Sequence, residues 1–562
     1  MADLARRLAV ARGDEPADVV VRGGRVLSVF TREWLDVDVA IADGWIAGLG
    51  EYDGAEVVDA TGRYVVPGFI DAHMHLESSK LLPDEFARLV LPLGTTAVIA
   101  DPHEIANVLG TDGVHWLLDA SAGIPLDVYF MASSSVPASE YESPRRALTE
   151  GDLEALLRRR RVLGIAEMMN FPGVVSGDEA ELAKLALATH VDGHAPGVRG
   201  RDLQAYAAAG VRSDHETSTL DEGRERLRAG MWLLVREASA ARNLRTLLPL
   251  VAEYGPARIA FCTDDREPEH IAEDGHINAM VRDAVEFGVS PEDALVMASH
   301  NPAQYHGLDH LGAIAPGRQA DLVLLADLDR FVPELVLKRG REVAEVPRAT
   351  VPDWVRHTVR IGALGPEVFR IAWSGGAARV IGLVPGQIIT ESLVEVPKHR
   401  GGEAVADPER DLAKIAVIER HLGTGRSGLG FVRGFGLRRG AIGSTLSHDA
   451  HNLVVVGMDD TSMAFAVRRL ANIGGGIVVV DGGELLAELA LPVAGILSDA
   501  PLATVVAASE ALVAAARELG CEIEAPFQLL AFLALSVIPA LKITDRGLVD
   551  VERFAIVPLR AE

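Results

Sequence analysis

Short apolar runs alternate with longer amphipathic stretches from about residue 68 to residue 300. Eight of these runs end in the segments GFIDAH, TTAVIAD, DVYFMAS, VLGIAEM, HVDGH, VRSDH, MWLLVRE and RIAFCTD. The stretches between them, such as DEAELAKLALAT and SPEDALVMAS, have helical spacing. Eight strand-then-helix units within about 230 residues predict a (β/α)₈ TIM-like barrel. An open doubly wound sheet is the alternative, but no glycine-rich phosphate turn follows the first strand, which favours the closed barrel.

Segments rich in β-pattern and turn signals flank this block. ADVVVRGGRVLSV and EWLDVDVAIADGWIAGLG precede it, and GAIAPGRQADLVLLAD and LVLKRGREV follow it. We expect them to form one small β-sandwich domain from two halves, residues 1–66 and 309–355, into which the barrel of residues 67–308 is inserted. Residues 356–562 alternate strands such as HNLVVVGM with helices such as LATVVAASEALVAAARELG, which predicts an additional C-terminal α/β domain.

The composition narrows the possible partners. Hydrophobic residues make up 49% of the 562 residues, which is typical of a globular protein with large cores. The chain has 54 Lys and Arg against 80 Asp and Glu, a formal charge of −26. Such a surface repels phosphate backbones, so we expect no nucleic-acid partner, whereas a small neutral substrate is not penalised.

The cysteine content and the apolar segments indicate a cytoplasmic protein. The two cysteines, Cys262 and Cys521, lie far apart in sequence, which excludes a disulfide framework and favours a reducing compartment. The first residues lack the apolar core of a secretory signal. The most apolar long region, residues 485–519, is interrupted by charged residues and prolines, so we expect buried strand and helix there and no membrane partner.

Two histidines, His73 and His75, stand one residue apart at the end of the first apolar run, in FIDAHMHLESS. Side chains alternate faces along a strand, so both imidazoles project from the same face and can bind one metal ion. An isolated His-x-His pair is more often two polar residues on a solvated strand face. The motif therefore needs support from the other strand ends.

The other strand ends supply that support. In a TIM-like barrel, functional side chains lie at the carboxyl ends of the strands. Those ends hold further candidate site residues, each of which alone has an ordinary explanation as a cap or a loop residue: His103 and Glu104 in DPHE, Glu167, His194, His215 and Glu216 in SDHE, and Asp264 and Asp265 with the neighbouring Arg266 in DDR. Their convergence on one rim predicts a metal site.

The ligand chemistry indicates which ions bind. Imidazole and carboxylate without thiolate suit Mn, Fe or Zn, and they argue against a structural zinc cluster. These ligands suffice for two adjacent ions sharing a hydroxide, and such ions lower the pKa of bound water from about 15.7 towards roughly 7. Asp264 can both ligate and accept the hydroxide's proton, whereas Cys262 is interpreted as core filler.

These residues resemble a known family. PGFIDAHMHLESS, the histidines of strands five and six and the aspartate of strand eight are similar to the amidohydrolase superfamily of metallo-dependent hydrolases, including its split β-sandwich. Many members carry a carboxylated lysine on strand four, but VLGIAEMMN places Glu167 there. With DPHEIANV, DGHAPG, SDHE and CTDDR, this substitution resembles the bacterial-type adenine deaminases. RRGAIGSTLSHDAHNLVVVG and NIGGGIVVV are similar to that family's extra domain, whereas SHNPAQYHG departs from the usual Thr-x-Asn.

The resemblance implies hydrolysis of adenine to hypoxanthine and ammonia, a reaction of purine salvage. It implies two divalent ions per chain, Mn²⁺ first and Fe²⁺ or Zn²⁺ as alternatives. One ion is expected on His73, His75 and Asp264, the second on His194 and His215, with Glu167 as the bridge. Attack at C6 requires protonation of N1, for which Glu216 is the first candidate and His103 or Glu104 the second.

The C-terminal segment SHDAHN, Ser447–Asn452, is expected to approach the substrate side of the metal pair, from the same chain or from a dimer mate. The substrate-side candidates are Asp265, Arg266, His448 and His451. We expect a homo-oligomer, with a dimer favoured. Two other functions stay open: another two-metal amidohydrolase that acts on a cyclic amide or a different aminopurine, and a non-catalytic scaffold with the same fold.

Overall fold

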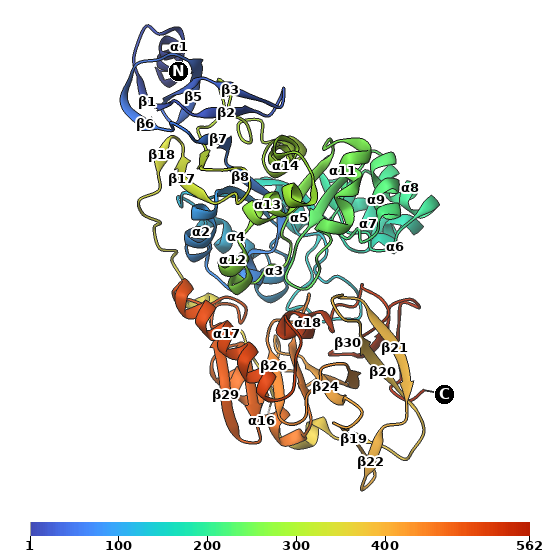
Figure 1. Cartoon of the computed structure of the whole chain (residues 1–562). Coiled ribbons are helices and arrows are strands. Elements are labelled where there is room, and N and C mark those ends of the chain that lie inside the picture. Colours follow the sequence, from blue (N-terminus) through green and yellow to red (C-terminus); the bar gives the residue numbers. More distant parts are fainter. Residues whose placement is uncertain (1, 363, 562) are drawn as a thin grey trace.

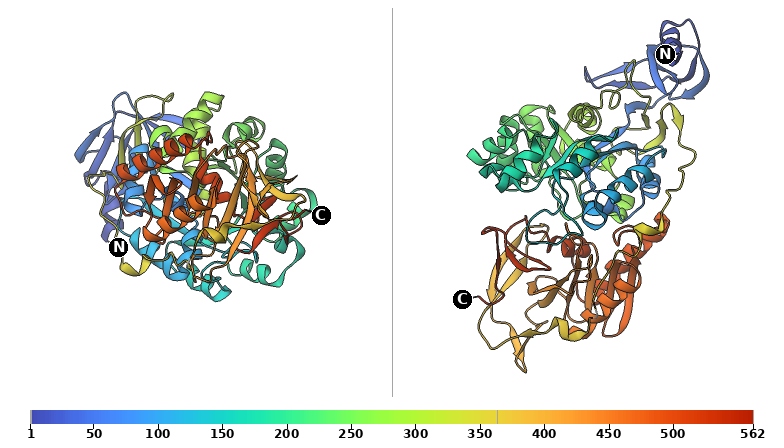
Figure 2. Two further views of the ribbon diagram at one scale, coloured as in Figure 1. Left: turned by 90° about the horizontal axis from the view of Figure 1, so that it is seen from below. Right: turned by 180° about the vertical axis from the view of Figure 1, so that it is seen from behind.

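The computed structural model describes residues 2–362 and 364–561. Figure 1 shows three parts along one long axis: two small sheets at the top, a barrel of strands and helices in the middle, and a large sheet with helices at the bottom. The view from behind in Figure 2 has the same order, with the N-terminus and the C-terminus at opposite ends.

The two small sheets pack face to face. The four-stranded sheet has the order β5-β4-β1-β6, and the six-stranded sheet has the order β18-β17-β16-β7-β2-β3. Alternation along β1 explains the packing, because Val19 and Val21 face the second sheet while Val20 faces α1 (Ala2–Arg12). The strands are β1 (Ala17–Arg22), β2 (Arg25–Ser28), β3 (Glu33–Asp36), β4 (Asp38–Ala42), β5 (Trp45–Gly50), β6 (Gly54–Asp59), β7 (Tyr64–Pro67), β16 (Leu322–Leu325), β17 (Pro333–Lys338) and β18 (Arg341–Glu342).

The six-stranded sheet joins segments that lie on either side of the barrel in sequence. β16 pairs antiparallel with β7, so that Val323 lies opposite Val66. β7 leads into the barrel and β16 follows it in sequence. Because these two strands pair, the sheet holds both ends of the barrel segment together.

The middle part has a TIM-like α/β fold. Its eight parallel strands coincide with the eight apolar runs expected from the sequence: β8 (Phe69–Met74), β9 (Thr95–Ala100), β10 (Asp127–Ala132), β11 (Val162–Met168), β12 (Val191–Gly193), β13 (Ser213–Asp214), β14 (Trp232–Arg236) and β15 (Ile259–Cys262). The first and last strands meet where Asp264 N donates to the His73 carbonyl at 3.0 Å. The short β12 and β13 meet where Arg212 N donates to the Val191 carbonyl at 3.0 Å.

Helices separate these strands and begin where the sequence supplies caps. Ser290 accepts a hydrogen bond from Asp293 N at the start of α14, and Pro291 occupies its first turn. The principal barrel helices are α2 (Pro83–Val90), α3 (His103–Leu109), α4 (Thr111–Ala120), α5 (Glu150–Leu157), α6 (Phe171–Ser176), α7 (Glu179–Leu185), α8 (Gly200–Ala208), α9 (Leu220–Arg228), α10 (Leu244–Leu247), α11 (Pro249–Tyr254), α12 (Pro268–Asp274), α13 (Ile277–Phe287), α14 (Pro291–Ala298) and α15 (His300–Tyr305).

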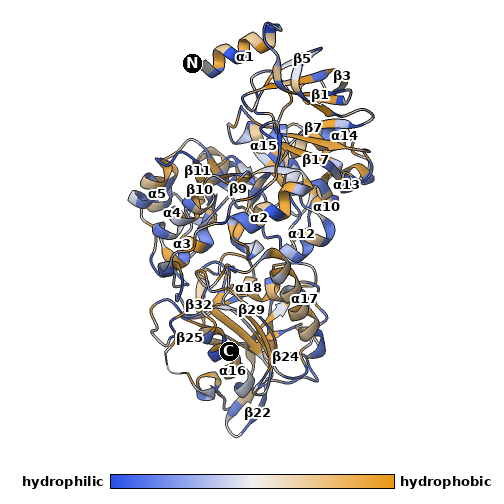
Figure 3. Cartoon of the chain, turned by 90° about the vertical axis from the view of Figure 1, so that its left-hand side faces the viewer, coloured by the Kyte–Doolittle hydropathy of each residue, from blue (hydrophilic) through white to orange (hydrophobic). Residues whose placement is uncertain are grey.

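The C-terminal part is built on an eight-stranded sheet in the order β21-β20-β25-β24-β27-β26-β28-β29. In Figure 3 its central strands are coloured hydrophobic, because they are covered on both faces. Its strands are β20 (Ala378–Leu383), β21 (Thr390–Glu395), β24 (Leu412–Ile418), β25 (Ser427–Arg433), β26 (Ala441–Ser444), β27 (Leu453–Gly457), β28 (Gly476–Asp481) and β29 (Glu484–Ala490), and its helices are α16 (Asp460–Asn472), α17 (Leu502–Glu518) and α18 (Pro526–Phe532).

Residues 485–519 form β29 and α17 with the connection between them. Among the described residues we find no helix long and apolar enough to cross a bilayer.

The C-terminal part packs on the carboxyl ends of the barrel strands. One hydrophobic cluster contains Leu76 and Leu81 of the barrel together with Val493 and Leu497. Backbone pairing continues across the junction, where Ser498 N donates to the Lys80 carbonyl at 2.8 Å. The two parts therefore share one core, and the rim that carries the candidate ligands is covered.

Candidate metal centre

Six candidate ligands from five barrel strands lie together at the covered rim. Each follows or ends its strand, and each side chain is at most 5% exposed. They are His73 on β8, His75 just after β8, Glu167 on β11, His194 after β12, His215 after β13 and Asp264 after β15.

His73, His75 and Asp264 form the first group. The His75 Nε2 atom is 3.0 Å from Asp264 Oδ1, and the His73 Nε2 atom is 3.5 Å from the same oxygen. The ring centroids of the two histidines are 5.0 Å apart. Their alternation along one strand therefore brings both imidazoles to one carboxylate, as the His-x-His spacing predicts.

Glu167 lies between the two groups. Its Oε2 atom is 2.7 Å from His194 Nδ1 and 3.3 Å from His215 Nε2, and its Oε1 atom is 3.4 Å from His75 Nε2. Burial raises the pKa of Glu167, but the imidazoles of His215 and His194 outweigh burial and hold that pKa well below its usual range. One oxygen thus faces each group, which is the arrangement required of a bridging carboxylate.

The donor set fits divalent cations. Buried ring nitrogens of His73, His194 and His215 and the Oε1 atom of Glu167 have no hydrogen-bond partner in the structure. Leaving such atoms unpaired inside a protein costs free energy, and a metal ion satisfies them. Four imidazoles and two carboxylates without a thiolate suit Mn²⁺, Fe²⁺ or Zn²⁺.

Outer contacts orient these ligands. A ring nitrogen, Nδ1 of His75, is 3.1 Å from the Asp101 carbonyl, so an Nδ1–H donor leaves Nε2 free to face Asp264. Asp71 accepts hydrogen bonds from the backbone N–H groups of His73 and Thr263, which ties β8 to β15. The ligands of the first group are therefore held by a buried carboxylate one layer below them.

Arg236, the last residue of β14, is a component of the site that the sequence analysis missed. Its guanidinium donates to both oxygens of Glu216 and, through Nη1, to Asp264 Oδ2 at 2.9 Å. Burial raises the pKa of Asp264, but the neighbouring imidazoles of His73 and His75 and the charge of Arg236 keep it well below its usual range. Applying the strand-end rule to MWLLVRE would have identified this residue.

The three candidates for N1 protonation occupy different places. Glu216 lines the cavity, and its Oε1 atom is 3.8 Å from His194 Nδ1 and 3.7 Å from His215 Nε2. His103 also lines the cavity, with Nδ1 3.6 Å from Glu167 Oε1. Glu104 lies behind this surface and accepts a hydrogen bond from the Ser78 hydroxyl at 3.0 Å.

The substrate-side candidates also occupy different places. Asp265 and His448 line the cavity. Arg266 does not line the cavity, and its guanidinium donates to the Glu237 carbonyl at 2.9 Å. His451 does not line the cavity either, because its ring is fully buried beside Glu104.

An apolar wall faces the metal ligands, and the sequence contained no local signal for it. Met169 of the barrel and Phe532, Leu535 and Ile538 of the C-terminal part line it. The Phe532 ring stacks on His448 with centroids 4.5 Å apart. The cavity measures about 20 Å³, about the size of one water molecule, so the C-terminal part closes over the centre.

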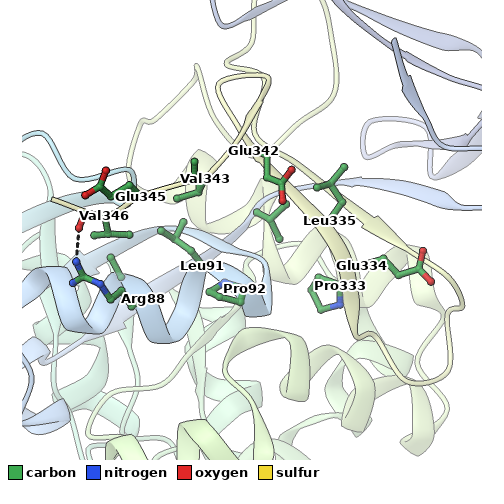
Figure 4. Close-up of a pocket in the computed structure, with 13 residues that line it drawn as sticks. Arg88, Leu91, Pro92, Pro333, Glu334, Leu335, Glu342, Val343, Glu345 and Val346 are labelled. Carbon is green, nitrogen blue, oxygen red and sulfur yellow. Dashed lines mark hydrogen bonds between the residues drawn. The ribbon is translucent and has the colours of Figure 1, made fainter. Parts of the chain in front are cut away.

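A much larger groove, of about 510 Å³, lies elsewhere, between α2 and β17. Figure 4 shows Arg88 donating to the Val346 carbonyl at one end of it, with Glu334 and Glu342 at its edge. It contains none of the six candidate ligands, so we do not assign the chemistry to it.

The chain matches two known protein families. Residues 64–343 match the Amidohydrolase family, and residues 387–555 match the family described as "Adenine deaminase C-terminal domain". The barrel, the convergent ligands and these matches define a hydrolase of the amidohydrolase family.

Full-length relatives narrow the class. "Adenine deaminase 2" of Carboxydothermus hydrogenoformans is 47% identical over 560 residues, covering 98% of each chain. "Adenine deaminase" of Methylobacterium sp. strain 4-46 is 48% identical and covers 99% of this chain and 100% of that protein. "Adenine deaminase" of Methylobacterium nodulans is 49% identical and covers 99% of each. The chain belongs to the adenine deaminase family.

Proposed function

We propose that this chain hydrolyses adenine to hypoxanthine and ammonia at the centre formed by His73, His75, Glu167, His194, His215 and Asp264. The family carries the assignment of substrate, because the relatives align over nearly the whole chain, including the C-terminal part that closes the site. The buried imidazole–carboxylate cluster supports the assignment of hydrolysis.

Two divalent cations are proposed for the centre, with Mn²⁺ first and Fe²⁺ or Zn²⁺ as alternatives. His73, His75 and Asp264 would hold one ion and His194 and His215 the other, bridged by Glu167. Bound ions of this kind supply a hydroxide nucleophile at neutral pH.

The chain's own residues move the protons. Hydrolysis needs one proton at N1 of adenine and one at the departing amine, and the attacking water supplies both. We assign the first to Glu216, which is paired with Arg236 as a carboxylate and can therefore accept a proton before passing it to N1. We assign the second to Asp264, which carries it to N6 so that ammonia leaves. His103 remains the second candidate for N1.

Position within the cavity supports this division of roles. Arg236 holds Glu216 and Asp264 a fixed distance from each other, so two proton carriers flank one reaction centre. Phe532, Leu535 and Ile538 exclude water from the opposite side, which strengthens electrostatic contacts at the purine. Asp265 and His448 remain the proposed polar contacts on the substrate side.

The domain division is proposed as residues 1–66 plus 309–355, 67–308 and 356–562. The mixed six-stranded sheet, the closed barrel and the eight-stranded sheet support it. The two buried, unpaired cysteines fit the proposed cytoplasmic setting, and adenine as substrate fits purine salvage. Exposed Val394 on edge strand β21 and exposed Val396 just after it support the proposal of a dimer.

Ammonia release from a panel of purines and pyrimidines tests the substrate. We expect adenine to react far faster than adenosine, because the small enclosed cavity leaves no room for a ribose. Faster turnover of adenosine, of a different aminopurine or of a cyclic amide would move the assignment to another two-metal amidohydrolase. No turnover of any of these by metal-replete protein would support the scaffold alternative.

A further inference from the structure

A second cluster of imidazoles and carboxylates lies between the barrel and the C-terminal part. His103, at the start of α3, comes from the barrel, and His448 and Asp449 come from the segment after β26. All three side chains are at least nine-tenths buried. None belongs to the six ligands of the proposed two-metal centre.

The spacing within this cluster is that of metal ligands. His103 Nε2 is 3.5 Å from Asp449 Oδ1, and His448 Nδ1 is 3.6 Å from the same oxygen. Hydrogen bonds from nitrogen to oxygen are shorter, at about 2.7–3.2 Å. Two ligand atoms each about 2.1 Å from one ion lie about 3.0 Å apart at a right angle and about 3.4 Å apart at the tetrahedral angle.

The six-ligand centre provides an internal comparison. The corresponding separations there are 3.0 Å for His75 and Asp264 and 3.3 Å for His215 and Glu167. The second cluster is only slightly more open than the first. Its geometry therefore matches a cation site better than a hydrogen-bonded network.

Buried atoms of this cluster lack hydrogen-bond partners. They are both ring nitrogens of His103 and the Oδ2 atom of Asp449. His103 Nε2 faces Asp449, and the other ring nitrogen, Nδ1, lies 3.2 Å from Asp101 Oδ2. A carboxylate beside the second ring nitrogen is the usual outer neighbour of a metal-bound histidine.

Acidic side chains are concentrated around the cluster. Five carboxylates are buried here, and among the described residues no Lys or Arg lies within 4.0 Å of any of them: Glu77, Glu104, Glu142, Asp265 and Asp449. A bound cation would place a positive charge among them.

We propose that His103, His448 and Asp449 bind a third divalent transition-metal ion, which links the barrel to the C-terminal part beside the substrate cavity. The site joins one histidine from the barrel to two residues from the other side of the junction, so it exists only when the two parts are docked. His103 is then a ligand, which leaves Glu216 as the group that acts on N1.

The neighbouring His451 is excluded from the ligand set. Its Nδ1 atom accepts a hydrogen bond from Ser447 N at 3.2 Å, so the proton of the neutral ring is on Nε2. That Nε2–H group faces Glu104 Oε2 at 3.5 Å and has no lone pair for a metal.

Metal content tests the proposal without reference to catalysis. Full-length protein is stripped with a chelator and equilibrated by dialysis against Mn²⁺, and bound Mn is counted by elemental analysis. We expect three Mn per chain for the wild type and two for Asp449→Asn. Ser447→Ala is the matched control from the same segment, because the Ser447 hydroxyl is buried without a partner, and it should keep three.

A crystal of the Mn-loaded wild type gives an independent readout that needs no variant. Anomalous scattering should place a third peak between His103 and Asp449. Two Mn per chain and two peaks in a protein that deaminates adenine would overturn the third site and leave the proposed function intact. Fewer than two Mn in active protein would overturn both proposals.

Discussion

At the scale of single residues, Asp264 combines a strained backbone with close contacts to three side chains of the proposed centre. It follows β15 with φ of 55°, in the left-handed region that costs a non-glycine residue energy. Contacts with His73, His75 and Arg236 hold it there. A strained carboxylate kept ionised by three neighbours suits a group that ligates and transfers a proton.

Replacing this carboxylate tests that assignment. Asp264→Asn removes the proton acceptor while keeping the size of the side chain, so we expect kcat to fall by about 10³-fold or more, roughly 4 kcal/mol of barrier. Steady-state kinetics with adenine measure the loss, which should fall on kcat more than on KM. Near-normal turnover would place the proton transfer elsewhere.

A second residue-scale prediction concerns acid stability. His421 is buried, and its Nε2–H donates to the Ala450 carbonyl at 2.6 Å, beside Asp449. Burial and the nearby charge of Arg420 lower the pKa of His421 to about 3. The unfolded chain binds this proton near pH 6.5 but the folded chain does not, so stability present above pH 6.5 is lost as the pH falls towards 3, by up to about 1.4 kcal/mol per unit.

His421→Gln keeps a donor for the Ala450 carbonyl and removes the titration. Its melting temperature should therefore fall less than that of the wild type between pH 6.5 and pH 5. His399→Gln is the control, because His399 is exposed on β22 (Lys398–Arg400) and its loss should not alter the acid response. Equal acid sensitivity of wild type and His421→Gln would contradict the assignment.

Residue positions at strand ends could be predicted, because the rule that places function there needs only the apolar pattern. His73, Glu167 and Asp264 were identified in this way. Arg236 ends a strand as well, but a charged residue at the end of an apolar run is also expected to be solvated. Arg266 was expected on the substrate side of the centre. The direction of its side chain depends on neighbours such as Glu237, which the local sequence pattern does not contain.

At the scale of elements, α18 forms the apolar side of the cavity. Its last residue, Phe532, stacks on His448, and the following Leu535 and Ile538 continue the wall. These residues lie more than 260 positions beyond the last barrel strand, so no periodicity could link them to the centre. The helix positions an aromatic face opposite the metal ligands, where a planar purine would bind.

Shortening that face should weaken substrate binding. Phe532→Ala should raise KM for adenine about tenfold or more, because a base–aromatic contact contributes about 1–3 kcal/mol, and it should leave metal content unchanged. Phe527→Ala is the matched control, since Phe527 lies on the same helix but packs in the core away from the cavity. If the two variants show the same KM, the wall has no part in binding.

At the scale of the whole molecule, the TIM-like α/β fold was predictable because eight apolar runs recur in order with helices between them. The junction was not predictable in the same way. From the sequence, Leu81 and Leu497 are each expected in the core of a separate domain. In the structure they belong to one hydrophobic cluster that crosses between the barrel and the C-terminal part. A residue buried against a distant segment has the same local pattern of hydrophobic and polar neighbours as one buried within its own domain.

The arrangement of the molecule explains why the metal centre is enclosed. The small sheets hold one end of the barrel, and the C-terminal part covers the other, so all six candidate ligands are withdrawn from water. Metal ions held by these ligands would supply a hydroxide there, and the carboxylates of Glu216 and Asp264 would flank the purine in a dry cavity. We therefore expect adenine hydrolysis by this chain to require metal.

Removing and restoring the metal tests this requirement most directly. Protein stripped with a chelator should release no ammonia from adenine, and activity should return as Mn²⁺ is added back. A variant carrying both His73→Ala and His75→Ala should stay inactive at every Mn²⁺ concentration. Ammonia release from adenine by metal-free protein, or its absence from metal-replete wild type, would contradict the account.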